Sequence, residues 1–235
     1  MTTIADRLAL AQQRIAAAAK NCVRNPEEIQ LLAVSKTKPI EDILAAYNAG
    51  QRYFGENYVQ EGQQKVEALQ QTCPDIVWHF IGPLQSNKSR IVAEYFDWMH
   101  TVDRAKIAER LNSQRPADKA PLNVCIQVNI SGEDSKSGVI DKDSMLALAK
   151  QIAALPNLNL RGLMAIPSHA DENQLAEELS TMQQLFATLK LGYASVDTLS
   201  MGMSDDLELA IANGSTMVRI GSAIFGERDY SAKAN

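Results

Sequence analysis

A lysine that directly follows a short apolar segment is the first residue of this sequence that could do chemistry. Lys36 comes after residues 31–35, which are apolar except for Ser35. An ammonium at the mouth of a low-dielectric interior loses hydration, which lowers its pKa and yields a nucleophilic amine that condenses with aldehydes or ketones. The alternative is a lysine whose charged end simply extends into solvent. The polar residues at the ends of other predicted strands decide between these two interpretations.

Two more polar side chains stand at the ends of the next two predicted strands. Asn57 offers amide donors and a carbonyl acceptor, and its alternative role is that of a helix N-cap. His79 alternates with large apolar residues, so it either faces a ligand or is a hydrogen-bonded histidine of the core. His100 and His169 stand at no metal-ligand spacing from His79, and we therefore expect no metal site.

Small residues accompany the last two predicted strands. Residues 200–204 read SMGMS, and Gly221 and Ser222 lie on the final strand. Barrels often bind phosphate with these two loops, because glycines let backbone N–H groups approach an anion and the hydroxyls of Ser200 and Ser222 add donors. The alternative is that Ser204 caps a helix and the glycines merely turn the chain. A nucleophilic lysine together with a phosphate cradle indicates an aldehyde that carries a phosphate ester, as pyridoxal 5'-phosphate (PLP) does.

These residues come together if the chain alternates buried strands with amphipathic helices. Short apolar runs predict eight strands, at residues 29–35, 52–55, 76–81, 98–102, 122–130, 158–166, 198–202 and 217–225. Helical periodicity predicts helices between them at residues 40–48, 58–70, 86–95, 104–113, 141–155, 172–191 and 207–213. We expect a TIM-type (β/α)8 barrel, a single domain over residues 1–235, whose outer ring is completed by a helix at residues 3–21. A doubly wound open sheet would instead require a glycine-rich loop after the first strand, where the sequence reads SKTKP.

Composition excludes several classes of protein. Of 235 residues 46% are hydrophobic and 22% charged, which suits a folded globular chain. The net charge of −5 and the lack of a dense basic segment argue against a nucleic-acid partner. Cys22, Cys73 and Cys125 are widely spaced, which predicts reduced thiols. With no predicted targeting segment or membrane span, we expect a cytoplasmic protein without a membrane partner.

Seven segments of the sequence closely resemble the pyridoxal phosphate homeostasis protein family, and they spread over nearly the whole chain. They are LLAVSKTKP (31–39), FGENYVQE (54–61), WHFIGPLQSNK (78–88), NISGEDSKSG (129–138), RGLMAIP (161–167), LSMGMSDDLE (199–208) and VRIGSAIFG (218–226). The resemblance implies a barrel similar to the N-terminal domain of bacterial alanine racemase, which is fold type III among PLP proteins.

The resemblance also implies a role for each candidate residue. Lys36 would hold PLP covalently as a Schiff base, and Asn57 and His79 would lie near the ring. Arg219 would face the pyridine nitrogen, and its permanently protonated guanidinium would keep that nitrogen from taking up a proton. The cofactor would then be a weaker electron sink. The phosphate would be held by Ser200, the backbone around Met201, Gly221 and Ser222.

The function that the resemblance implies is PLP homeostasis and not catalysis. Alanine racemase needs a second, β-rich domain and a tyrosine from a dimer partner, and this chain ends at Asn235 soon after its last predicted strand. We therefore expect a monomeric PLP carrier or buffer that affects amino-acid and keto-acid balance and passes PLP to apo PLP-dependent enzymes. The alternatives are a weak amino-acid racemase and a Schiff-base aldolase acting on a phosphosugar. The loop 131–138, which carries Lys136, is a candidate to close over the site or to accept cofactor for transfer.

Overall fold

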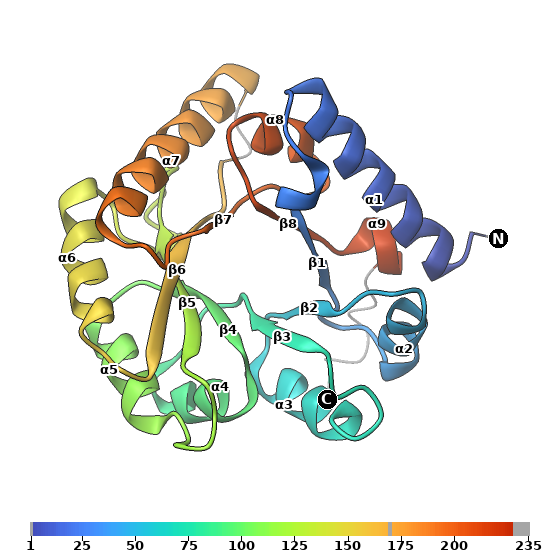
Figure 1. The fold of residues 1–235 in the computed structure, drawn as a ribbon, viewed down its shortest axis with the longest axis horizontal. Helices are drawn as coiled ribbons and strands as arrows, with labels where there is room; N and C mark the ends of the chain where they lie inside the picture. Colours follow the sequence, from blue (N-terminus) through green and yellow to red (C-terminus); the bar gives the residue numbers. More distant parts are fainter. Residues whose placement is uncertain (1, 169–170, 228–235) are drawn as a thin grey trace.

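Parallel strands form the centre of the molecule in the computed structural model, which describes residues 2–168 and 171–227. The strands close into a barrel in chain order, with β8 paired to β1. The expected TIM-type barrel is thus confirmed, with helices surrounding the strands (Figure 1). The strands are β1 (Gln30–Val34), β2 (Tyr53–Glu56), β3 (Val77–Phe80), β4 (Trp98–Val102), β5 (Leu122–Val128), β6 (Leu158–Ala165), β7 (Thr198–Ser200) and β8 (Met217–Ile220).

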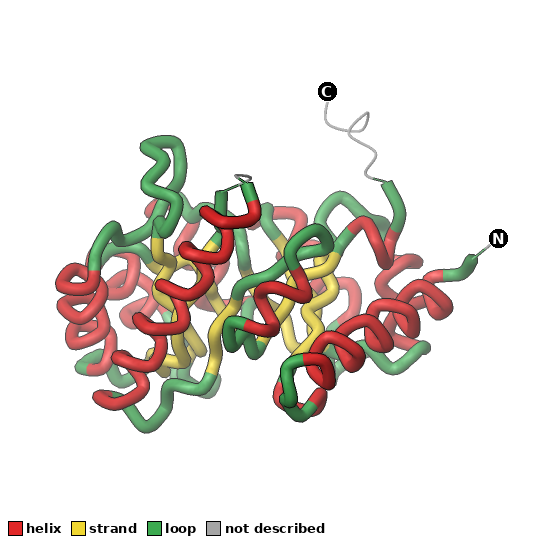
Figure 2. Tube along the Cα trace, turned by 90° about the horizontal axis from the view of Figure 1, so that it is seen from above, coloured by secondary structure: helices red, strands yellow, loops and turns green. Residues whose placement is uncertain are grey.

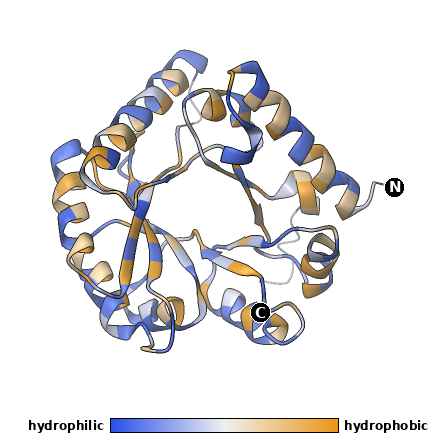
Figure 3. Ribbon diagram, viewed as in Figure 1, coloured by the Kyte–Doolittle hydropathy of each residue, from blue (hydrophilic) through white to orange (hydrophobic). Residues whose placement is uncertain are grey.

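The outer ring consists of helices that bury one face against the strands. They are α1 (Ile4–Asn21), α2 (Ile40–Asn48), α3 (Val59–Leu69), α4 (Ser89–Tyr95), α5 (Ala105–Gln114), α6 (Lys142–Ala153), α7 (Glu172–Gly192), α8 (Leu207–Ala212) and α9 (Ser222–Phe225), with 3₁₀ turns at Pro26–Glu28 and Ser86–Lys88. Hydrophobic and hydrophilic residues alternate along these helices (Figure 3), as one buried face requires. The side view in Figure 2 shows the strands enclosed between helices.

The N-terminal helix completes the ring, as the sequence predicts. Helix α1 starts at a capping box formed by Thr3 and Asp6, and it buries Leu8 and Ile15. It contacts α2, α8 and α9. An ion pair between Arg14 Nε and Glu208 Oε1, 2.6 Å apart, ties α1 to α8. Helix α1 therefore covers the part of the barrel where the chain has only the short helix α9 after β8.

The last strand is shorter than the sequence predicts. We expected a strand over residues 217–225, but β8 ends at Ile220 and Ser222–Phe225 forms helix α9. The amides of Ile224 and Phe225 both donate to the carbonyl of Gly221, 2.9 Å away in each case. A short apolar run cannot by itself distinguish a buried strand from a buried helical turn. The correction places Ser222 at the start of a helix beyond the carboxyl end of β8.

Two further observations bear on expectations from composition. Cys22, Cys73 and Cys125 are all free, and the last two are buried. Within the described residues, no helix has the length and apolar character needed to cross a membrane.

Candidate cofactor-binding site

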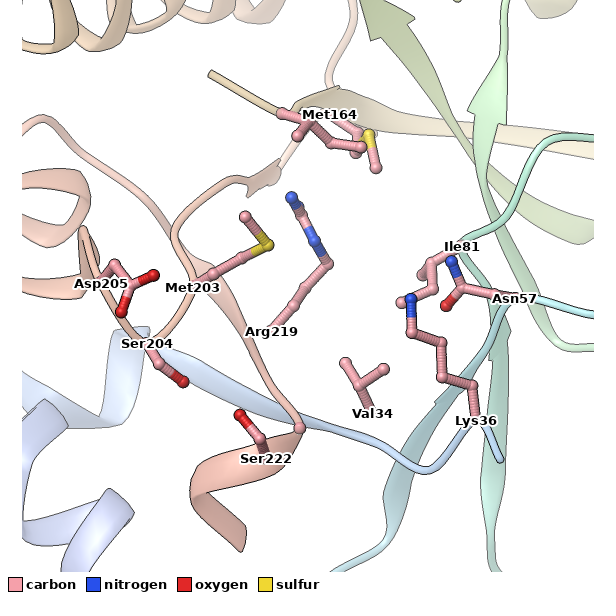
Figure 4. Close-up of a pocket in the computed structure, with 12 residues that line it drawn as sticks. Val34, Lys36, Asn57, Ile81, Met164, Met203, Ser204, Asp205, Arg219 and Ser222 are labelled. Carbon is pink, nitrogen blue, oxygen red and sulfur yellow. The ribbon is translucent and has the colours of Figure 1, made fainter. Parts of the chain in front are cut away.

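A cavity of about 390 Å³ lies at the carboxyl ends of the strands, the end of a TIM barrel where sites are found. Its volume falls in the range of small-molecule sites. Figure 4 shows side chains from opposite walls directed into it. The described residues that line it are Val34, Lys36, Asn57, Ile81, Met164, Ile166, Met203, Ser204, Asp205, Arg219, Gly221 and Ser222.

One wall carries the two polar residues that follow β1 and β2. Lys36 is half-buried, and its amine lies beside the side chain of Asn57 (Figure 4). Asn57 does not cap a helix, because Tyr58 occupies the N-cap position of α3. Within the part of the chain that the structure describes, Asn57 Oδ1 is buried without a hydrogen-bond partner. A buried acceptor without a hydrogen-bond partner is costly unless a ligand or water donates to it. The position of Asn57 therefore favours a ligand that carries a hydrogen-bond donor.

The opposite wall carries a buried guanidinium from β8. Arg219 Nη1 donates to Ser200 Oγ at 2.8 Å, and Nη2 donates to the carbonyl of Ala165 at 2.9 Å. Both acceptors are neutral. Burial lowers the pKa of Arg219 to about 10, so the group stays protonated near pH 7. A buried cation with neutral partners favours a ligand that presents a lone pair or a negative charge to it.

The hydroxyl groups of the site come from the loops after β7 and β8. Ser204 and Ser222 lie at one end of the cavity and their side chains point toward each other (Figure 4). The loop after β7 turns at Gly202, which has a φ of +98° and where a Cβ atom would lie 2.7 Å from Ala210 Cβ. Asp206 Oδ1 accepts from the Met203 amide at 2.6 Å and fixes the loop. Together these hydroxyls can bind the oxygens of a phosphate.

Three residues that the resemblance implicates lie beneath the cavity instead of lining it. Ser200, Met201 and His79 are fully buried in the barrel. The amide of Met201 donates to the carbonyl of Met217 at 3.2 Å, so that N–H group already has a partner. The hydroxyl of Ser200 accepts from Arg219, so this serine contacts the guanidinium.

Ser204 lines the cavity in their place, although the sequence suggested it only as a helix cap. Asp206, and not Ser204, occupies the N-cap position of α8. Strand β7 ends at Ser200, two residues earlier than residue 202, where we expected its end. The earlier end of the strand brings Met203 and Ser204 to the cavity. The glycine at the centre of the SMGMS segment was the signal that could have located the end of the strand.

His79 belongs to a buried hydrogen-bonded chain that ends at Arg219. His79 Nδ1 lies 2.8 Å from His100 Nε2, and His100 Nδ1 lies 2.8 Å from Ser200 Oγ. The ring of His79 also stacks on Trp98, with 5.0 Å between centroids. Burial lowers the pKa of His79 to about 3 and that of His100 well below its usual value, so both rings are neutral. The core interpretation of His79 fits this geometry, with an indirect connection to the cavity.

Sequence reasoning missed the role of His100, because histidines on neighbouring strands show no spacing signal. Within residues 2–168 and 171–227 there is no group of three or more His, Cys, Asp or Glu side chains that could hold a metal. Lys136 does not line the cavity. Its ammonium forms an ion pair with Glu133, at 2.8 Å, and donates to the carbonyl of Pro167 at 3.1 Å.

Comparisons with known proteins bring further observations. A family model described as the N-terminal domain of alanine racemase matches residues 8–229. The pyridoxal phosphate homeostasis protein of Escherichia coli is 59% identical over 99% of this chain and 100% of its own length. The structure of PipY from Synechococcus elongatus with PLP bound is 36% identical, with a TM-score of 0.79 over 95% of this chain and 100% of that one. An alanine racemase of Clostridium difficile, 16% identical, shares the fold with a TM-score of 0.68 over 92% of this chain and 56% of that one.

Proposed function

This chain belongs to the pyridoxal phosphate homeostasis protein family, and we propose that it binds PLP in the cavity at the carboxyl end of the barrel and buffers or delivers it in the cell. The observation that carries the proposal is the pairing of Lys36 with Arg219 across one cavity. An amine on one wall suits the aldehyde of PLP, and a buried guanidinium on the other suits its pyridine nitrogen. The proposal takes residues 1–235 as one functional unit and names PLP and apo PLP-dependent enzymes as its partners.

Each cavity residue has a role in this proposal. Lys36 would hold PLP through a covalent bond between its amine nitrogen and the aldehyde carbon, with the aldehyde oxygen leaving as water. Asn57 contacts the ring through its orphaned carbonyl oxygen or its amide. Gly221 and Ser222, joined by Ser204, hold the phosphate.

The buried residues act indirectly. Ser200 and His79 belong to the hydrogen-bonded chain that fixes the orientation of Arg219, and Met201 is a buried residue of the loop after β7. Their effect on the cofactor therefore passes through the guanidinium and the loop. We therefore propose indirect roles for these three residues, in place of direct contact with the phosphate or the ring.

A carrier function suits the side chains of the cavity better than catalysis does. Bound PLP supplies an aldehyde that exchanges between amines and a ring that can withdraw electrons. Arg219 donates to the ring nitrogen and keeps it unprotonated, which weakens that electron withdrawal. Among the described residues that line the cavity, only Lys36, Asp205 and Arg219 are titratable. None of the described residues that line the cavity is a histidine or tyrosine that could move a proton at a substrate carbon, and we propose that the protein is not an efficient enzyme.

The first experiment is an absorption spectrum with and without added PLP, followed by borohydride reduction and mapping of the modified peptide. We expect a visible band and a reduced adduct on Lys36, and neither in Lys36→Ala. Lys38→Ala is the matched control, because this nearby lysine donates to the carbonyl of Glu227 and lies outside the cavity lining. An adduct on another lysine, or none, would refute the assignment.

A second set of measurements separates carrier from enzyme. A carrier returns activity to an apo PLP-dependent enzyme when mixed with it, and it does not exchange the α-hydrogen of amino acids with deuterium from solvent. Exchange that disappears in Lys36→Ala would identify a racemase. A borohydride-trapped adduct that forms with a sugar phosphate and not with PLP would identify a phosphosugar aldolase.

A further inference from the structure

The segment that carries Lys36 is a tight turn with an unfavourable backbone conformation. The amide of Lys38 donates to the carbonyl of Ser35 at 3.1 Å and closes a turn in which Lys36 and Thr37 occupy the two central positions. Thr37 has a φ of +62°, in the left-handed region that β-branched residues rarely adopt. Glycine or asparagine is usual at such a position. Contacts from elsewhere in the fold must therefore hold the turn.

Three charged residues behind the turn supply those contacts, and we call them the Lys65 cluster: Glu56 at the end of β2, and Glu61 and Lys65 on α3. The ammonium of Lys65 lies 2.8 Å from an oxygen of each carboxylate. Glu56 is fully buried and only 6% of the Lys65 side chain is exposed. The cluster is absent from the lining of the cavity, so it lies outside the site described above.

The Lys65 cluster holds the turn on both sides of Lys36. On the near side, Lys65 donates to the carbonyl of Ser35 at 2.7 Å, and the hydroxyl of Ser35 donates to Glu56 at 2.6 Å. On the far side, the amide of Thr37 donates to Glu61 Oε1 at 2.5 Å. The residue before Lys36 is thus anchored to Glu56 and Lys65, and the residue after it to Glu61, all within one cluster.

Stability alone gives a poor account of this cluster. The desolvation of buried charges offsets much of their attraction, so apolar residues of similar size often stabilise a core as well or better. Burial also raises the pKa of Glu56 to about 7, which shows how unfavourable its charged form is there. Apolar residues in place of Glu61 and Lys65 could neither accept the hydrogen bond of the Thr37 amide nor donate one to the carbonyl of Ser35.

We propose that the Lys65 cluster is a positioning device for Lys36, which holds the strained turn so that the amine stays at the wall of the cavity. The proposal rests on the proposed function for the covalent role of Lys36. Gly221, Ser222 and Arg219 reach the cavity from the end of β8 and not from this turn. Damage to the cluster should therefore slow the covalent step and leave noncovalent binding of the ring and phosphate nearly unchanged.

The test compares two variants of Glu61 with a control on the same helix. Glu61→Ala removes the acceptor for the amide of Thr37, whereas Glu61→Gln keeps a carbonyl oxygen in its place. Glu67→Ala is the control, because Glu67 is an exposed residue of α3 whose side-chain partners, Gln63 and Tyr95, are not part of the turn. For each protein, the rate of C=N bond formation with PLP is followed by stopped-flow absorbance. Noncovalent affinity is measured with pyridoxamine phosphate, which carries an amine in place of the aldehyde and cannot form a C=N bond with Lys36.

We expect Glu61→Ala to slow bond formation about fivefold or more, the effect of losing one hydrogen bond. Its affinity for pyridoxamine phosphate should stay within about twofold of the unmodified protein. Glu61→Gln should recover most of the rate, and Glu67→Ala should match the unmodified protein. Adding Thr37→Gly to Glu61→Ala should also recover part of the rate, because glycine adopts positive φ without strain.

Two results would overturn the positioning role. One is an unchanged rate in a folded Glu61→Ala protein, and the other is a loss of pyridoxamine phosphate affinity that parallels the loss of rate, which would indicate general loosening of the pocket. Amide hydrogen exchange at Thr37 in the cofactor-free protein is an independent readout, and it should accelerate in Glu61→Ala and not in Glu67→Ala. If the unmodified protein forms no adduct on Lys36, the proposed function fails instead, and only the exchange result still tests the turn.

Discussion

Replacing His79 by asparagine is expected to remove part of the acid sensitivity of the barrel. Burial lowers the pKa of His79 from 6.5 to about 3. Because the folded-state pKa is depressed, the unfolded chain binds more protons than the folded chain between these two values. The stability that neutral His79 contributes is therefore fully present above pH 6.5, and it is lost progressively as the pH falls toward 3.

The size of this effect follows from the shift in pKa. Each pH unit below 6.5 costs about 1.4 kcal/mol for one histidine, so the cost at pH 5 is about 2 kcal/mol. Over the full interval down to pH 3 the cost reaches about 5 kcal/mol, a large share of the stability of an ordinary domain. His100 shifts in the same direction, and its hydrogen bond to His79 couples the two titrations.

The assay is urea unfolding at a series of pH values from 4.5 to 7.5, for the unmodified protein and for His79→Asn. Asparagine places an amide near the position of Nδ1, so it can keep a hydrogen bond to His100. The comparison uses the slope of the unfolding free energy against pH, because any general loss of packing shifts the whole curve without changing its slope. We expect the slope below pH 6.5 to fall by about 1.4 kcal/mol per pH unit in the variant. Parallel curves for the two proteins would refute the reasoning.

Three further predictions concern other parts of the fold. Burial raises the pKa of Glu56 from 4.5 to about 7, so near neutral pH the folded chain holds a proton that the unfolded chain has lost. Stability therefore falls as the pH rises through 7, by about 1 kcal/mol between pH 6.5 and 8.5 in the unmodified protein and not in Glu56→Gln. Equal slopes of the unfolding free energy against pH in urea unfolding would contradict this. Arg219→Glu should shift the absorption band of bound PLP while borohydride still traps Lys36, and an unchanged spectrum would remove Arg219 from the ring nitrogen. Gly162→Ala should cost about 3 kcal/mol, because its Cβ would lie 1.7 Å from the carbonyl oxygen of Thr198. Gly192→Ala, with open space around it, should change stability by less than about 1 kcal/mol, and similar thermal shifts for the two variants would contradict the difference.

The barrel could be predicted from the sequence because its strands are buried on both faces. Such strands appear as short continuous apolar runs, and β1, which reads QLLAV and buries its last four residues, is the clearest case. The positions of Lys36 and Asn57 followed from the same logic, since a polar residue after a buried run must lie at the end of a strand. The carboxyl end of β8 could not be predicted in this way, because the buried residues Ile224 and Phe225 continue the apolar pattern into a helix.

The remaining features depend on contacts between residues distant in sequence. Glu61 and Lys65 stand four residues apart, a spacing typical of an ion pair on an exposed helix face. Lys65 is buried and Glu61 partly buried because α3 packs closely at Gly62, where a Cβ atom would lie 2.5 Å from the ring of Phe96 at the end of α4. Nothing local to α3 indicates that approach. The contact of His79 with His100 likewise depends on the register of two neighbouring strands.

The hydrogen-bonded chain beneath the cavity links Arg219 in the site to His79 in the core, through Ser200 and His100. A guanidinium can only donate, so Ser200 Oγ accepts from Arg219. When the hydroxyl hydrogen of Ser200 is directed to His100 Nδ1, His100 carries its hydrogen on Nε2 and donates to His79 Nδ1, and the Nε2–H group of His79 has no partner among the described residues. This order requires both rings to be neutral, as burial makes them. A proton added to His100 would remove the acceptor that Ser200 needs, so the orientation of Arg219 in the cavity depends on the same neutral histidines that make the barrel sensitive to acid.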